Sequence, residues 1–250
     1  IAGIIVSLAA FIGCFTIAFH LSAAEFSPNV ARSTVFIDNY NVHGDFSSWG
    51  SGFFVDEGIV VTNKHVVKAG KNYRIFATGP DNKIDFSCYK NITRSDVKMN
   101  LEDDVAYIRV YLSCEHGVVH FAASDPVIGS PIGVLGYPGR STIEETFTLY
   151  QTTGIVTSTT DGPWLATNAE IHSGNSGGPV VQDGNVVGVA VANVTLGGQI
   201  YLSGLFVPMS VILDGLLYAN SSSFGYTPQI RQAKPSLATT VDLADESASD

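Results

Sequence analysis

Short runs of β-branched and aromatic residues recur along the chain and constrain its fold more than any other feature. Each run is rich in Val, Ile, Phe, Tyr or Thr, and Gly, Asp, Asn or Pro residues separate it from the next. Helical periodicity is scarce, so the pattern predicts an all-β protein. The expected strands are residues 33–37, 52–55, 59–62, 73–77, 85–89, 105–111, 131–136, 146–156, 164–167, 180–181, 186–191 and 200–208.

The composition fits a folded enzyme and excludes several other classes. With 250 residues, 45% of them hydrophobic, the chain can bury a substantial core. A net charge of −10 without a Lys/Arg cluster argues against nucleic acid as a partner, because phosphate binding needs a basic face. The three cysteines are far apart and no histidines are paired at helical spacing. We therefore expect no metal and no cofactor.

The segment 174–179, Gly-Asn-Ser-Gly-Gly-Pro, has the layout that a nucleophilic serine needs. Glycines on both sides allow a sharp turn, so the Ser176 hydroxyl and nearby backbone N–H groups can point at one carbonyl. A glycine-rich turn that contains serine is by itself more often an ordinary loop. A catalytic interpretation therefore needs a base and an acid elsewhere in the chain.

His65 is the candidate base. It follows two short apolar strands that an Asp-Glu-Gly turn joins at residues 56–58, so its imidazole is expected where a rigid strand meets a loop. The other histidines are interpreted as surface or satisfied core residues. These are His20, His43, His116, His120 and His172.

Asp104 is the candidate acid. It is the last carboxylate of an acidic cluster that runs directly into a strand, so it is the one drawn inward, where it can accept the Nδ1–H of a histidine. Asp103 is its rival. Acidic residues before a strand usually form a solvated turn, and only His65 and Ser176 single these two out.

The chain resembles trypsin-like serine proteases of the chymotrypsin fold, and within them the HtrA (Deg) type. The order His, Asp, Ser is that of chymotrypsin-like enzymes and differs from the subtilisin and α/β-hydrolase orders. The resemblance spans about residues 34–213. The matching segments are 50–53, 61–67, 104–106, 136–139, 153–157, 174–179 and 204–208.

This resemblance implies two six-stranded antiparallel β-barrels within a protease domain at residues 33–217. Barrel one would cover about residues 33–122 and barrel two about 130–213, with a crossover at 121–130. The catalytic histidine and aspartate would come from the first barrel and the serine from the second. The site would then lie in the cleft between them.

The resemblance also implies roles for individual residues. Ser176 would attack the scissile carbonyl, His65 would accept and return its proton, and Asp104 would orient the imidazole. The backbone N–H groups of Gly174 and Ser176 would form the oxyanion hole. The partners would be protein or peptide substrates, and the family leaves a homo-oligomer open.

The primary substrate pocket is expected beside the nucleophile, with Glu170, Ile171 and His172 on one side and Val191 and Asn193 opposite. An inward Ile171 would favour small or medium aliphatic residues, as the resemblance suggests. An inward Glu170 would favour basic residues, and His172 would favour acidic ones. The sequence leaves these alternatives open.

Residues 1–24 contain no Asp, Glu, Lys or Arg and are long enough to cross a hydrocarbon core of about 30 Å. We expect a transmembrane anchor. Because Ser-Ala-Ala at residues 22–24 resembles a signal-peptidase site, a signal-like segment is the alternative.

Cys88 and Cys114 lie in strands expected to pair around a turn, and the sequence leaves open whether they form a disulfide or remain two buried thiols. Anchor and disulfide together would place the catalytic domain outside the cytoplasm.

Residues 219–250 are polar and small, and we expect a disordered tail with no room for the PDZ domain that HtrA-type proteins usually carry. Three functions fit these observations. One is a membrane-anchored protease acting in protein quality control or regulated proteolysis. Another is a viral polyprotein-processing protease, which self-cleavage would distinguish. The third is an inactive protease-like binding module, against which the intact triad residues argue.

Overall fold

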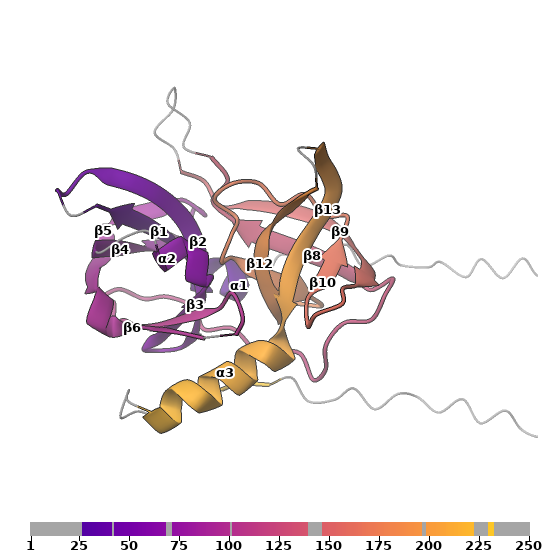
Figure 1. Cartoon of the computed structure of the whole chain (residues 1–250). Coiled ribbons are helices and arrows are strands. Elements are labelled where there is room, and N and C mark those ends of the chain that lie inside the picture. Colours follow the sequence, from indigo (N-terminus) through magenta and orange to yellow (C-terminus); the bar gives the residue numbers. More distant parts are fainter. Residues whose placement is uncertain are drawn as a thin grey trace, which may run out of the picture.

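Two antiparallel β units lie side by side, and a C-terminal helix lies below both of them (Figure 1). The computed structural model describes residues 27–41, 43–68, 72–100, 102–139, 147–196, 199–222 and 230–232. The anchor expected at residues 1–24 lies outside these ranges. Within them, no helix is both apolar enough and long enough to span a membrane.

The first unit is a seven-stranded sheet with the order β5-β4-β1-β2-β3-β7-β6. The expected six-stranded barrel is corrected here, because β6 pairs with β7 and adds a seventh strand. That strand is only three residues long and carries a lysine in its middle, so no apolar run marks it. The elements are α1 (Pro28–Ser33), β1 (Thr34–Tyr40), β2 (Phe46–Asp56), β3 (Ile59–Thr62), α2 (Lys64–Lys68), β4 (Asn72–Thr78), β5 (Ile84–Thr93), the 3-10 turn η1 (Arg94–Asp96), β6 (Val97–Met99) and β7 (Ala106–Arg109).

The second unit is a closed barrel with the strand order β10-β13-β12-β11-β8-β9. Its interior is filled by aliphatic side chains such as Ile132, Val134 and Val187, together with Phe206. The elements are β8 (Pro131–Gly136), β9 (Tyr150–Thr159), β10 (Leu165–Thr167), β11 (Pro179–Gln182), β12 (Asn185–Leu196), β13 (Gln199–Pro208) and the following helix α3 (Met209–Ser222).

Alternation along β1 separates the core of the first unit from the interface between the units. Val35 and Ile37 point into the first unit, whereas Phe36 points the other way. The Phe36 ring meets that of Tyr137, just beyond β8, edge-on at a centroid distance of 5.7 Å. Burial raises the pKa of Tyr137 well above its ordinary value. The interface is therefore a buried, largely apolar core, which holds the two units in one arrangement.

Helix α3 is tied to both units. Asp125, in the connection between them, accepts hydrogen bonds from the backbone N–H and the hydroxyl of Ser210 at 3.0 and 2.5 Å. The Tyr107 hydroxyl of β7 donates to the Ile212 carbonyl at 2.9 Å. Because this tyrosine is buried and two carboxylates lie near it, its pKa is raised well above its ordinary value.

Two short parts of the segment in which a disordered tail is predicted, residues 219–222 and 230–232, belong to the described structure. Helix α3 continues through Ser222. Gln232 forms a parallel bridge with Phe121, whose N–H donates to the Arg231 carbonyl at 2.8 Å. Ile230 packs against the interface core. The rest of the predicted tail lies outside the described residues.

A disulfide joins Cys88 and Cys114, whose Cα atoms are 6.0 Å apart. It does not link two paired strands as the sequence suggested: Cys88 lies in β5, which pairs with β4, and Cys114 follows β7 in a loop. Strands β5 and β7 lie near opposite ends of the sheet order. The disulfide therefore connects the loop that follows β7, near one end of the strand order, to β5, the strand at the other end.

Replacing both cysteines with alanine is expected to lower the free energy of unfolding by about 3–4 kcal/mol. A cross-link over a sequence separation of 26 restricts the unfolded chain by that order in the chain-entropy model. Denaturant unfolding with and without reductant measures the loss. The double variant should no longer respond to reductant, and a wild-type protein that is equally stable when reduced would contradict the prediction.

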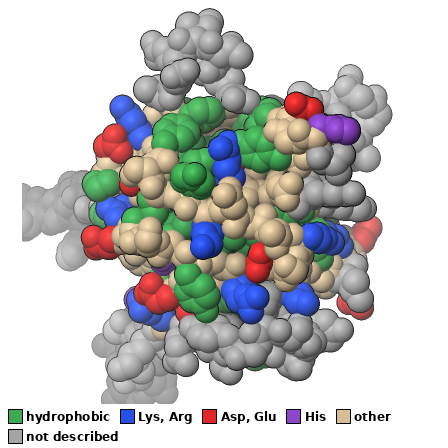
Figure 2. Space-filling view, turned by 90° about the vertical axis from the view of Figure 1, so that its left-hand side faces the viewer, with side chains coloured by type: hydrophobic (Ala, Val, Ile, Leu, Met, Phe, Trp, Pro, Cys, Tyr) green, Lys and Arg blue, Asp and Glu red, His purple; other side chains and the backbone are tan. Residues whose placement is uncertain are grey.

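Charged side chains of both signs are scattered among hydrophobic and neutral ones on the side of the molecule where the first unit lies (Figure 2). On β4, Arg74 pairs with Asp38 at 2.8 Å and lies over the Tyr40 ring, 4.5 Å from its centroid. Such a mixed surface is typical of a face exposed to solvent.

Candidate active site

His65 and Asp104 form a two-point contact. His65 lies on α2, directly after β3, and its backbone N–H donates to Asp104 Oδ1 at 2.9 Å. Its Nδ1 lies 2.5 Å from Asp104 Oδ2 and donates to it, because an ionised carboxylate can only accept. The imidazole is 47% exposed and the carboxylate 15%. This pair fixes both the tautomer and the direction of the ring, and leaves Nε2 as the second reactive nitrogen.

The loop that carries Asp104 is held by the residues before His65. The Asn63 side chain, which is fully buried, donates to the Asp104 carbonyl at 2.9 Å. The Lys64 ammonium donates to the Asn100 carbonyl at 3.2 Å. Asp103 instead accepts from the Asn100 amide at 3.2 Å. The structure therefore brings Asp104, and not its rival, against the histidine.

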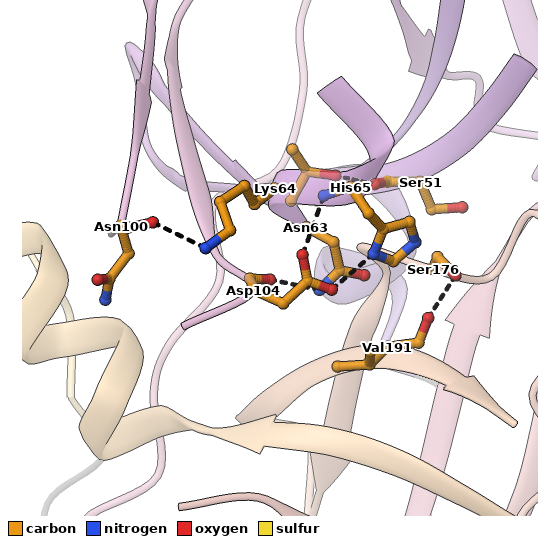
Figure 3. Close-up of polar contacts among 9 residues, drawn as sticks. Ser51, Asn63, Lys64, His65, Asn100, Asp104, Ser176 and Val191 are labelled. Carbon is orange, nitrogen blue, oxygen red and sulfur yellow. Dashed lines mark hydrogen bonds and ion pairs between the residues drawn. The ribbon is translucent and has the colours of Figure 1, made fainter. Parts of the chain in front are cut away.

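Ser176 comes from the second unit and lies beside His65 (Figure 3). Its hydroxyl donates to the Val191 carbonyl of β12 at 2.5 Å. Its own carbonyl accepts from the Ser51 N–H of β2 at 2.8 Å. Gly50 allows this approach, since a Cβ there would lie 3.1 Å from the Ser176 carbonyl oxygen and 2.7 Å from Val66 Cγ1. Helix α2 and the loop that carries Ser176 thus both pack against Gly50.

The two peptide units that carry the N–H groups of Gly174 and Ser176 have fixed directions. The Ser173 carbonyl accepts from Gly139 N–H at 3.0 Å, and the Asn175 carbonyl accepts from Gly178 N–H at 2.9 Å. In a trans peptide the next N–H points away from that carbonyl. The N–H groups so aimed belong to Gly174, whose φ is +102°, and Ser176. Among the described residues, neither of these two donors has an acceptor.

The described pocket residues separate into two buried and two exposed side chains. Ile171 is 1% exposed and packs on β13 at Gly204, where a Cβ would lie 2.5 Å from Ile171 Cδ1. Glu170 and His172 are exposed and contact each other at 3.1 Å. Val191 is buried and its carbonyl faces Ser176.

The side chain of Asn193, the remaining predicted pocket residue, lies outside the described set. Sequence reasoning missed Asn63 and Ser51. Both could have been noticed only as polar residues inside apolar segments next to the predicted motifs. In the described part of the chain, no three His, Cys, Asp or Glu side chains are grouped so as to hold a metal ion.

Comparison with known proteins finds a peptidase family and several serine proteases. The family described as "Trypsin-like peptidase domain" matches residues 50–189. Serine protease HTRA1A of Danio rerio is 35% identical over 165 residues, which are 59% of this chain and 31% of that protein. A probable periplasmic serine endoprotease DegP-like of Rhizobium meliloti is 26% identical over 209 residues, 78% of this chain and 39% of that protein. The chain thus spans only about a third of the length of these relatives.

A solved structure, the serine endoprotease from Yersinia pestis, has a TM-score of 0.61 at 20% identity and covers 79% of this chain and 68% of its own. This likeness shows the chymotrypsin-like fold, with one closed barrel and one further sheet in this chain. The family match covers more than half of the 250 residues. The relatives that the chain matches include HtrA- and DegP-like serine proteases, and the family match shows that the chain belongs to the trypsin-like peptidase family.

Proposed function

We propose that this protein cleaves peptide bonds by using His65, Asp104 and Ser176 as a catalytic triad. The observation that carries the proposal is the contact between His65 and Asp104. Because Asp104 occupies Nδ1, the imidazole offers Nε2 as the base, and Ser176 lies on that side of the site (Figure 3). The buried contacts around Asp104 keep this orientation without help from a ligand.

The reaction begins with a rotation of the Ser176 hydroxyl from the Val191 carbonyl to His65 Nε2. Ser176 Oγ then bonds to the scissile carbonyl carbon while its proton passes to Nε2. The N–H groups of Gly174 and Ser176 stabilise the negative carbonyl oxygen. The C–N bond breaks as the imidazolium returns the proton to the leaving amine. This leaves an ester between Ser176 Oγ and the acyl part of the substrate. Water then attacks the ester carbonyl carbon while it gives a proton to Nε2, and the bond to Oγ breaks as that proton passes to Oγ and the acid product leaves.

The proposed pocket accepts small or medium aliphatic side chains. Ile171 occupies the space over Gly204, and the carboxylate of Glu170 is turned to solvent, where it cannot meet a basic side chain at the base of the pocket. Val191 adds an apolar wall.

A random peptide library tests both activity and this preference. We expect cleavage after residues such as Ala and Val. Ile171→Ala should raise kcat/KM for larger aliphatic residues by about 10-fold or more, since a methylene in such a pocket is worth 10–200-fold. Glu170→Gln is the matched control and should leave the preference unchanged. Cleavage after Lys or Arg that Glu170→Gln abolishes would contradict this assignment.

Three observations support the cellular setting that we propose. A DegP-like relative is described as periplasmic, the chain contains a disulfide, and residues 1–24 are apolar. We therefore place the catalytic domain outside the cytoplasm, tethered to a membrane by residues 1–24, where it acts in protein quality control or regulated proteolysis.

A further inference from the structure

We propose that Ser51 is a positioning residue that holds the oxyanion-binding loop of the second unit from the first unit. The inference rests on the proposed function. Ser51 lies in β2, is fully buried, and does not reach the reacting atoms itself. Its contacts cross the interface between the two units.

Ser51 uses its hydroxyl and its backbone together. The hydroxyl donates to the Gly174 carbonyl at 2.7 Å and accepts from the Tyr137 N–H at 3.0 Å. The Ser51 N–H donates to the Ser176 carbonyl at 2.8 Å. Its carbonyl accepts from the Thr62 hydroxyl at 2.6 Å, which anchors Ser51 to β3. One residue of the first unit therefore binds the loop at the residues on either side of Asn175.

The hydroxyl is the contact that determines the direction of the Gly174 peptide. The unit formed by the Gly174 carbonyl and the Asn175 N–H is held at one end by Ser51 and at the other by the His172 carbonyl, 2.9 Å from Asn175 N. Without Ser51 Oγ, a buried carbonyl loses its donor. Since glycine has wide backbone freedom, this peptide can then rotate about the Gly174 bonds, and the adjoining Ser173–Gly174 peptide, which carries the Gly174 N–H, is no longer fixed from that side.

The loop has no comparable anchor at Asn175. The Asn175 side chain is fully buried between the units, yet neither its Oδ1 nor its Nδ2 has a hydrogen-bond partner among the described residues. The hydrogen bond from the Ser51 hydroxyl to Gly174 is therefore the side-chain contact that fixes the loop to the first unit. It also makes the geometry of the oxyanion donors depend on the packing of one unit against the other.

Ser51→Ala tests this role, with Ser33→Ala as the matched control. Ser33 is equally buried, and its hydroxyl donates to the Val30 carbonyl at 2.7 Å, within α1 and away from the loop. We expect Ser51→Ala to lower kcat by up to about 100-fold, the lower end of what loss of one oxyanion donor costs. KM should not change, because the interaction acts in the transition state. Affinity for a peptide boronate should fall in parallel, whereas affinity for the product peptide should not.

A merely structural serine would lower stability in both variants and leave kcat of the folded protein unchanged; that result would overturn the proposal. If Ser51→Ala does not fold, Ser51→Cys keeps the size with a weak donor, and wild-type kcat in that variant would overturn it equally.

Amide hydrogen exchange over residues 172–178 gives an answer that does not depend on catalysis. Exchange should be faster in the Ser51 variant and unchanged in Ser33→Ala, and equal exchange in both would again overturn the role. If the wild-type protein has no peptidase activity, that result would instead contradict the proposed function.

Discussion

Replacing Ser176 with alanine is expected to abolish peptide cleavage, lowering kcat by about a millionfold, as loss of the nucleophile does in serine proteases. Within the described part of the chain, the hydroxyl has one hydrogen bond, to the Val191 backbone carbonyl, and that bond contributes little to the fold. The variant should therefore keep the wild-type circular dichroism and thermal midpoint. Cleavage of the best library peptide measures the loss.

Ser158→Ala is a suitable control for this variant, because Ser158 is exposed on β9 and away from the loop. It should retain full activity. A Ser176→Ala protein that still cleaves at the wild-type rate would show that another group is the nucleophile, and the assignment of the site would be wrong.

Replacing Asp104 with asparagine should lower kcat by about 10⁴-fold without displacing the residue. An amide oxygen can still accept the His65 backbone N–H. The amide NH₂, however, then faces Nδ1, so the ring must carry its proton on Nε2 and can no longer accept one from Ser176. Steady-state kinetics on the same peptide measure the effect.

Asp103→Asn is the matched control, since it makes the same chemical change one residue earlier. Asp103 contacts the Asn100 amide and not the histidine. This variant should have close to wild-type kcat. Equal losses in the two variants would mean that the acidic loop acts as a whole and that Asp104 has no special role.

The sequence predicted most of the fold because most strands carry a strong local pattern. Every expected strand overlaps an observed one, since runs such as 131–136 alternate or concentrate β-branched residues and end at turn residues. Strand β6 lacked such a run, and it is placed by its pairing with β7. Helix α3 was also missed, because its helical state depends on packing against β12, β13 and Tyr107 more than on its own caps.

In the candidate site, too, the residues with a local sequence pattern could be predicted and their long-range contacts could not. His65, Asp104 and Ser176 could be singled out because each lies in a recognisable local segment. Their contacts with Asn63, Val191 and Ser51 could not, because those hydrogen bonds join residues 15 to 125 positions apart along the chain. The choice among Glu170, Ile171 and His172 likewise depended on which side chain the barrel buries.

The most direct test of the triad is covalent labelling with an active-site serine reagent such as a fluorophosphonate. Such reagents react with a serine whose hydroxyl a neighbouring base activates. We predict a single adduct on Ser176, located by peptide mass spectrometry, that forms much more slowly in Asp104→Asn. Absence of an adduct on the folded wild-type chain, or an adduct on another residue, would contradict the account.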